Sequence, residues 1–126
     1  MAKILVADDE EIIGRMVEFR LSNAGHEIVR ARDGKEALEY ASSKKPDLVL
    51  LDVLMPVFDG LEVLERIKED PALATIPVIM LTAKGRESDV VAGFKRGAID
   101  YIIKPFSLSE LTARVDAALA NEPVGA

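Results

Sequence analysis

The sequence has no cysteine and no tryptophan in its 126 residues, and it contains one histidine. A protein without cysteine needs no oxidising compartment, so the composition favours a cytoplasmic location. Because cysteine is missing and His26 is the only histidine, a metal ion would have to be held by oxygen ligands. His26 lies beside Gly25, which is placed to end a helix, and we interpret this histidine as an exposed loop residue.

Long apolar runs and an excess of positive charge are also missing. No segment is long enough to cross a bilayer, and the first residues lead into a predicted strand rather than a secretory leader, so we expect no membrane association. The net charge of -6 opposes direct binding of nucleic acid by this domain, because such binding depends on clustered Lys and Arg. The 49% hydrophobic and 30% charged residues are typical of an ordinary globular domain.

Strand and helix patterns alternate regularly along the chain. Short apolar runs predict strands at 3–7, 28–31, 48–51, 78–81 and 101–103, and an amphipathic pattern after each run predicts a helix. Five such alternations predict an α/β fold, with helices on both faces of a parallel sheet and right-handed crossovers. We expect a single domain over residues 1–126, with an ordered core at 3–120 and a frayed tail at 121–126.

Polar residues follow four of the five predicted strands. Asp8 and Asp9 come after the first strand, Asp52 after the third, Thr82 after the fourth and Lys104 after the fifth. The carboxyl ends of parallel strands meet at one edge of a sheet. We therefore expect three carboxylates, a hydroxyl and an ammonium group to converge in one crevice.

The residue types in this crevice favour phosphoryl transfer. Close carboxylates repel one another unless a cation joins them, and a site made only of oxygen ligands suits Mg2+, with Mn2+ as a second choice. Once the metal neutralises Asp8 and Asp9, Asp52 can attack phosphorus as a carboxylate nucleophile. Thr82 could then donate to one phosphoryl oxygen, and Lys104 could pair with another.

Each of these residues also has a purely structural interpretation. The acids at 8–11 could stabilise the N-terminus of a helix, and Asp52 could belong to a proline turn. Thr82 could be a loop hydroxyl, Lys104 a solvated charge and Tyr101 a packing residue. We interpret three further residues as helix caps, each with a Glu three positions later: Asp33, Asp59 and Ser107.

Four stretches in this order and spacing resemble the receiver domain of bacterial two-component response regulators, of the chemotaxis-regulator type. They are VADDE at 6–10, LDVLMPVFDG at 51–60, LTA at 81–83 and GAIDYIIKPF at 97–106. The resemblance covers residues 3–120. It implies a flavodoxin-like (βα)5 three-layer sandwich whose five-stranded parallel sheet has the order 2-1-3-4-5.

The resemblance implies a role for each matching acidic residue. Asp52 resembles the aspartate that is phosphorylated by a sensor histidine kinase or a histidine phosphotransfer protein. Asp9 resembles the direct Mg2+ ligand, and Asp8 resembles a metal neighbour that acts mostly through water. Leu54 resembles the residue that offers its backbone carbonyl to the metal.

Four further residues resemble the parts of such a domain that bind and sense phosphate. Thr82 and the backbone N–H of Ala83 resemble the phosphoryl-binding pair, and Lys104 resembles the lysine that pairs with the phosphate and precedes a cis proline, here Pro105. Tyr101 resembles the aromatic residue that turns inward as the threonine moves towards the phosphoryl group. Together they imply a switch driven by a local charge of about -2.

The resemblance also implies an output surface, made of residues 87–96, 101–103 and 108–120, that controls a downstream protein or output domain. Gly93 interrupts a thin apolar stripe, which gives this region a physical reason to move. Relatives with a DNA-binding output domain dimerise here through charged pairs. Asp100, Glu110 and Arg114 match part of that set, but Val90 lies where a basic residue is expected.

Two other functions are compatible with parts of this pattern. A phosphatase of the haloacid-dehalogenase type also uses an aspartate nucleophile, Mg2+, a threonine and a lysine, but its second aspartate lies two positions after the first, where this chain has Leu54. Flavin binding would need a Ser/Thr/Gly-rich loop after the first strand. We therefore expect a phosphoacceptor that assists its own phosphorylation and dephosphorylation, not an enzyme with an external substrate.

Overall fold

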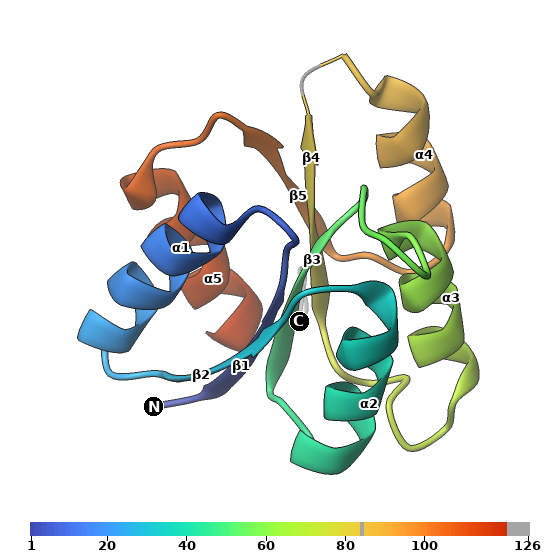
Figure 1. The fold of residues 1–126 in the computed structure, drawn as a ribbon, viewed down its shortest axis with the longest axis horizontal. Coiled ribbons are helices and arrows are strands. Elements are labelled where there is room, and N and C mark those ends of the chain that lie inside the picture. The colour runs from blue at the N-terminus through green and yellow to red at the C-terminus, as the bar shows by residue number, and fades with distance from the viewer. Residues whose placement is uncertain (84, 121–126) are drawn as a thin grey trace.

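The computed structural model describes residues 1–83 and 85–120 and contains five strands and five helices in strict alternation within them (Figure 1). The strands are β1 (Lys3–Ala7), β2 (Glu27–Ala31), β3 (Leu48–Asp52), β4 (Val78–Ala83) and β5 (Asp100–Lys104). The helices are α1 (Glu11–Asn23), α2 (Gly34–Lys44), α3 (Gly60–Glu69), α4 (Glu87–Lys95) and α5 (Leu108–Ala120). The predicted tail at 121–126 lies outside the described residues.

All four strand pairs in the sheet are parallel, and the strand order is β2-β1-β3-β4-β5. The flavodoxin-like α/β fold and its strand order are therefore confirmed. The strands extend further than the apolar runs indicate, because Asp52, Thr82 and Lys104 form part of β3, β4 and β5. The polar side chains are thus fixed by the hydrogen-bond ladder of the sheet instead of lying on loops beyond it.

The helices cover both faces of the sheet. In Figure 1, α1 and α5 lie on one side, and α2, α3 and α4 lie on the other. Alternation along each strand divides the core accordingly, since successive side chains point to opposite faces. Leu50 and Leu81 pack in the cluster beside α1 and α5, whereas Leu51 and Met80 pack in the cluster beside α2 and α3.

β3 is the centre of this architecture. All five of its residues are buried, and it lies between β1 and β4 in the sheet. A strand without polar alternation is stable only where both faces are covered, as in a parallel sheet with helices on each side. The apolar run before Asp52 therefore places that carboxylate at the centre of the sheet edge.

The three predicted capping patterns are confirmed. Asp33 accepts a hydrogen bond from the N–H of Glu36 at 2.8 Å, and Asp59 accepts one from Glu62 at 2.9 Å. Ser107 accepts one from Glu110 at 3.0 Å. The acids before α1 do not cap that helix in this way, since its N-cap Glu10 makes no side-chain cap bond. Because these acidic side chains do not cap α1, they can take part in the cluster of charged groups at the edge of the sheet.

None of the helices within residues 1–83 and 85–120 combines the length and apolar character that a transmembrane span requires.

Candidate functional site

Asp8 and Asp52 bring two buried carboxylates together at the carboxyl edge of the sheet. Asp8 follows β1, has 1% of its surface exposed and accepts a hydrogen bond from the N–H of Glu10 at 2.8 Å. Asp52 ends β3, is 4% exposed and accepts a longer bond of 3.3 Å from the N–H of Leu54. Because burying a carboxylate is costly, a compensating charge must lie close to both groups.

Lys104 supplies that charge. Its Nζ lies 3.1 Å from Asp52 Oδ2, 3.1 Å from Asp8 Oδ2 and 2.9 Å from Glu10 Oε1. The contact with Asp8 is an ion pair without hydrogen-bond geometry, so Asp8 Oδ2 has no hydrogen-bond partner within the described residues. Burial opposes the charge on Lys104, but its bond to Glu10 and the nearby aspartates outweigh burial and raise its pKa.

One lysine does not balance these acids. Burial raises the pKa of Asp52 to about 7, and the charge of Asp8 adds to this rise, which Lys104 offsets only in part. A carboxyl group with such a pKa is partly protonated at neutral pH, where an ordinary aspartate is ionised. The site as a whole is therefore short of positive charge, and a cation would relieve the repulsion.

The carboxylates are arranged to hold such a cation. Asp8, Glu10 and Asp52 each offer an oxygen, and these oxygens lie within 4.8 Å of one another. Asp9 is exposed and is not part of this cluster. Leu54 is also exposed, and its N–H donates to Asp52 of the cluster. The oxygen-only donor set, together with the buried Asp8 Oδ2, fits a hard divalent ion such as Mg2+.

Thr82 provides a hydroxyl at the adjacent strand end. Its surface is 1% exposed, and its Oγ1 makes no hydrogen bond to any group in residues 1–83 and 85–120. Ala83, the last residue of β4, is exposed and lies opposite Lys104 in the β4–β5 ladder. A buried hydroxyl without a partner is costly, which indicates that a ligand or a conformational change satisfies it.

Tyr101 is buried between β5 and α4. Its ring packs against Phe94 with centroids 5.2 Å apart, and its hydroxyl donates to the backbone oxygen of Asp89. Burial and the charge of Asp89 raise its pKa. The structure therefore shows this ring buried against α4. It also contains the cis Lys104–Pro105 peptide bond that the resemblance implies.

Sequence reasoning missed two residues that shape the site. Glu10 was counted among the acids after β1, but the bond to Lys104 that brings it into the cluster became visible only in the structure. Gly60 allows α3 to start against β3, since a Cβ there would lie 2.1 Å from the backbone oxygen of Asp52. The Asp59–Gly60 pair was the available signal, but it predicts a turn and a cap rather than this close approach.

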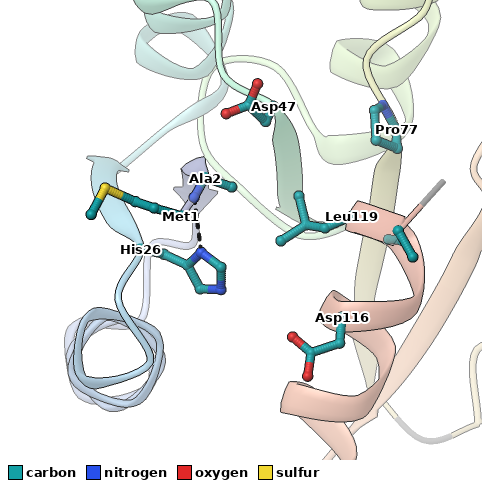
Figure 2. A pocket seen from close by; sticks show the side chains of 9 residues that line it. Met1, Ala2, His26, Asp47, Pro77, Asp116 and Leu119 are labelled. Carbon is teal, nitrogen blue, oxygen red and sulfur yellow. Dashed lines mark hydrogen bonds between the residues drawn. The ribbon is translucent and has the colours of Figure 1, made fainter.

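A separate cavity of about 530 Å3 lies at the opposite end of the sheet, where the strands begin (Figure 2). Residues before β1, β3 and β4 line it, including Ala2, Asp47 and Pro77. His26 is half-buried there and accepts a hydrogen bond from the N–H of Ala2 at 3.1 Å, so the prediction that it is exposed was wrong. Open α/β sheets keep their sites at the other edge.

Fold and site together define an α/β protein of the flavodoxin-like class with an acidic, lysine-bridged cluster at the carboxyl ends of its strands. The chain belongs to the family of response regulator receiver domains, whose model matches residues 4–116. Receiver domains of response regulators are phosphorylation-activated switches in two-component signalling, and they bind Mg2+ at an acidic pocket. The predicted family is thus confirmed, and the phosphatase alternative is not favoured.

Curated relatives are transcriptional regulators. The chain is 44% identical over 124 residues to the alkaline phosphatase synthesis transcriptional regulatory protein PhoP of Bacillus subtilis, covering 98% of this chain and 51% of that protein. It is 42% identical over 119 residues to the DNA-binding dual master transcriptional regulator RpaA of Synechocystis, covering 94% and 49%. The chain therefore spans about half the length of these relatives.

Solved structures agree. The receiver domain of NtrX from Brucella abortus is 36% identical, with a TM-score of 0.88 and coverage of 94% of this chain and 99% of that one. The chemotaxis protein CheY4 of Vibrio cholerae is 33% identical, with a TM-score of 0.88 and coverage of 94% and 98%. The chain thus matches receiver domains over nearly their whole length.

Proposed function

We propose that Asp52 is the phosphoacceptor of this receiver domain and takes its phosphoryl group from a sensor histidine kinase or a histidine phosphotransfer protein. The observation that carries this proposal is the position of Asp52 at the end of the buried central strand, with Lys104 Nζ 3.1 Å from its Oδ2. A carboxylate oxygen forms a bond to phosphorus while the bond from phosphorus to the donor breaks, and the donor leaves with that electron pair.

Mg2+ is the metal that we propose for the acidic pocket, and Mn2+ can replace it because it accepts the same oxygen ligands. Asp8 and Asp52 contribute carboxylates, and Leu54 offers its backbone carbonyl. We keep Asp9 as a direct ligand by resemblance, although Glu10 has the carboxylate that lies in the cluster. The bound metal supplies positive charge that holds the phosphoryl oxygens and lets Asp52 ionise.

Thr82, Ala83 and Lys104 are the proposed phosphoryl-binding groups. The unsatisfied Oγ1 of Thr82 can donate to one phosphoryl oxygen, and the backbone N–H of Ala83 can donate to another. Lys104 would exchange part of its contact with Asp8 and Glu10 for the phosphoryl group, which carries a charge of about -2. Phosphorylation thereby changes the partners of three residues on two adjacent strands.

The output of the switch is proposed to lie on the surface formed by α4, β5 and α5. Tyr101 connects it to the site, because it packs against α4 and lies on the same strand as Lys104. Arg114 pairs with Asp100 at 2.8 Å and with Glu110 at 3.0 Å inside this chain. The charges of Asp100, Glu110 and Arg114 are therefore paired within this chain. The exposed side chains of Val91 and Phe94 offer apolar area to a downstream protein or output domain.

We further propose that residues 1–126 form a single receiver domain that works in the cytoplasm. The domain would assist its own phosphorylation and dephosphorylation without turning over an external substrate. Its relatives PhoP and RpaA are named as transcriptional regulators, so a DNA-binding output region in the whole protein is compatible with the match over half their length. The net charge of -6 argues against direct DNA contacts by the domain itself.

Labelling tests the assignment of Asp52. Incubation with acetyl phosphate and Mg2+ should add one phosphoryl group, located by mass spectrometry of peptides, and Asp52→Asn should remove the label. Asp59→Asn is the matched control, because it makes the same change on the loop that follows β3 and keeps a capping side chain on α3. Full labelling of the Asp52→Asn protein at another residue would refute the assignment.

A further inference from the structure

Gly93 occupies an unusual place in α4. Of the nine residues of this helix, all of which the structure describes, only Gly93 is buried. Glycine in the interior of a helix weakens it relative to alanine, so a buried glycine needs a packing reason. The sequence alone suggests that Gly93 makes α4 mobile, whereas the structure shows which group occupies the space that a side chain would fill.

That group is Tyr101. A Cβ on Gly93 would lie 1.9 Å from the Tyr101 hydroxyl oxygen and 2.7 Å from Cζ, both far below any sustained contact. The hydroxyl is anchored at this point, since it donates to the backbone oxygen of Asp89, one helical turn earlier. Phe94 packs against the ring at 5.2 Å with a tilt of 52°, so the ring has little room to shift along α4.

The same ring lies on the same face of the sheet as the proposed phosphoryl-binding hydroxyl. Tyr101 is paired with Met80 in the β4–β5 ladder, and Thr82 is two residues further along β4. Because side chains alternate along a strand, Thr82 points to the same face of the sheet as Met80 and Tyr101. The Tyr101 ring and the Thr82 hydroxyl therefore lie on one face of the sheet, on the neighbouring strands β5 and β4.

We propose that Gly93 is the positioning residue of Tyr101, because the buried ring position under α4 exists only while residue 93 has no side chain. This proposal rests on the proposed function in that Tyr101 links the phosphorylated site to the output surface. Any larger residue at position 93 forces the ring outward. The domain would then accept a phosphoryl group while the Tyr101 ring stays out of its buried position under α4.

The test is Gly93→Ala in a Tyr40→Phe background, which leaves Tyr101 as the only tyrosine. With acetyl phosphate and Mg2+ present, the parent should show NMR contacts from the Tyr101 ring to the Gly93 Hα and to the Phe94 ring. Gly93→Ala should lose these contacts, and its tyrosine pKa should fall to the ordinary value of about 10. Retention of the ring contacts in the variant would overturn the proposal.

Ser88→Ala is the matched control, since it removes a poor helix former from an exposed position of α4 and leaves the ring contacts in place. If Gly93→Ala does not fold, the double variant with Tyr101→Ala decides. Recovery of folding on removal of the ring shows that the clash is with Tyr101, and failure to recover overturns the proposal.

Labelling of Asp52 keeps the two proposals distinguishable. Gly93→Ala should be labelled by acetyl phosphate to within about twofold of the parent, because residue 93 touches none of the groups around Asp52. Loss of labelling at Asp52 in the parent would refute the proposed function and leave the contact between Gly93 and Tyr101 still measurable. A variant that is labelled and keeps its ring inward would refute only the role of Gly93.

Discussion

Replacing Asp52 by Asn should stabilise the metal-free protein, and the gain should depend on pH. Asn keeps the shape of the side chain but removes one of the two buried carboxylates that repel each other. Lys104 keeps its contacts with Asp8 and Glu10 in the variant, so no charge is left unpaired. The substitution at the proposed phosphoacceptor therefore relieves the repulsion between two buried carboxylates in the wild-type site.

The size of the effect follows from the pKa of Asp52, which burial and Asp8 raise from 3.8 to about 7. The folded protein binds the Asp52 proton more tightly than the unfolded chain does. The stability that this group contributes is therefore fully present below about pH 4 and is lost as the pH rises towards 7. At about 1.4 kcal/mol per pKa unit the ceiling is about 4 kcal/mol, and solvent screening at the open edge of the sheet reduces it to about 2 kcal/mol.

The assay is thermal or urea unfolding of both proteins with a chelator present, at pH 5 and pH 8. Asp52→Asn should be more stable than wild type by about 2 kcal/mol at pH 8, or about 8 °C in Tm, and by less at pH 5. Saturating Mg2+ should stabilise wild type more than the variant, because the variant lacks one carboxylate of the proposed metal site. Asp59→Asn controls for loss of one negative charge.

A gain that is equal at both pH values would show that Asp52 does not titrate as the geometry implies. A variant that is less stable than wild type at pH 8 would refute the repulsion between Asp8 and Asp52 altogether. Either result would remove the physical reason for a cation in this pocket.

Three further predictions concern the metal, the lysine and one strained loop residue. Asp9→Ala and Glu10→Ala should each weaken Mg2+ binding in a titration if both carboxylates bind the metal, and unchanged affinity in one variant discards that residue as a ligand. Lys104→Ala should destabilise the metal-free protein by about 3 kcal/mol at pH 8, because two buried carboxylates lose their counter-charge, with a smaller loss at pH 5, and equal losses would contradict this account. Val57→Gly should raise the unfolding free energy by about 0.5–1 kcal/mol in urea titrations, because Val57 has a φ of 72° that a β-branched side chain adopts poorly, and a loss of stability would contradict the assigned strain.

Much of the fold was predictable because its signals are local. The buried run at 48–51, the capping pairs that begin with Asp33 and Asp59, and the five alternations of strand and helix follow from apolar spacing and short-range hydrogen bonds. The strand order was not predictable in this way, because the local sequence pattern of a strand in a parallel sheet does not indicate which strands lie beside it. It came from resemblance to the receiver family and was confirmed by the sheet itself.

The details of the site depended on contacts between distant parts of the chain. Lys104 and Glu10 are 94 positions apart, and nothing in the sequence around either residue indicates their bond. Gly93 illustrates the same limit, since a glycine in a helix predicts weakness, whereas its contact with Tyr101 depends on how α4 packs on β5. The prediction that His26 is exposed was wrong for the same reason, because Ala2 lies beside it only in the folded chain.

By itself, the order of residues determined which groups lie at or near the strand ends: an acid after β1, an acid at the end of β3, a hydroxyl on β4 and an amine on β5. Alternation and strand length fix these positions without reference to the rest of the molecule. Only the tertiary structure decided that one ammonium group lies 3.1 Å from two buried carboxylates and that a tyrosine ring fills the space over a glycine. Such distances come from packing helices on a twisted sheet, where close contacts join residues that the sequence separates.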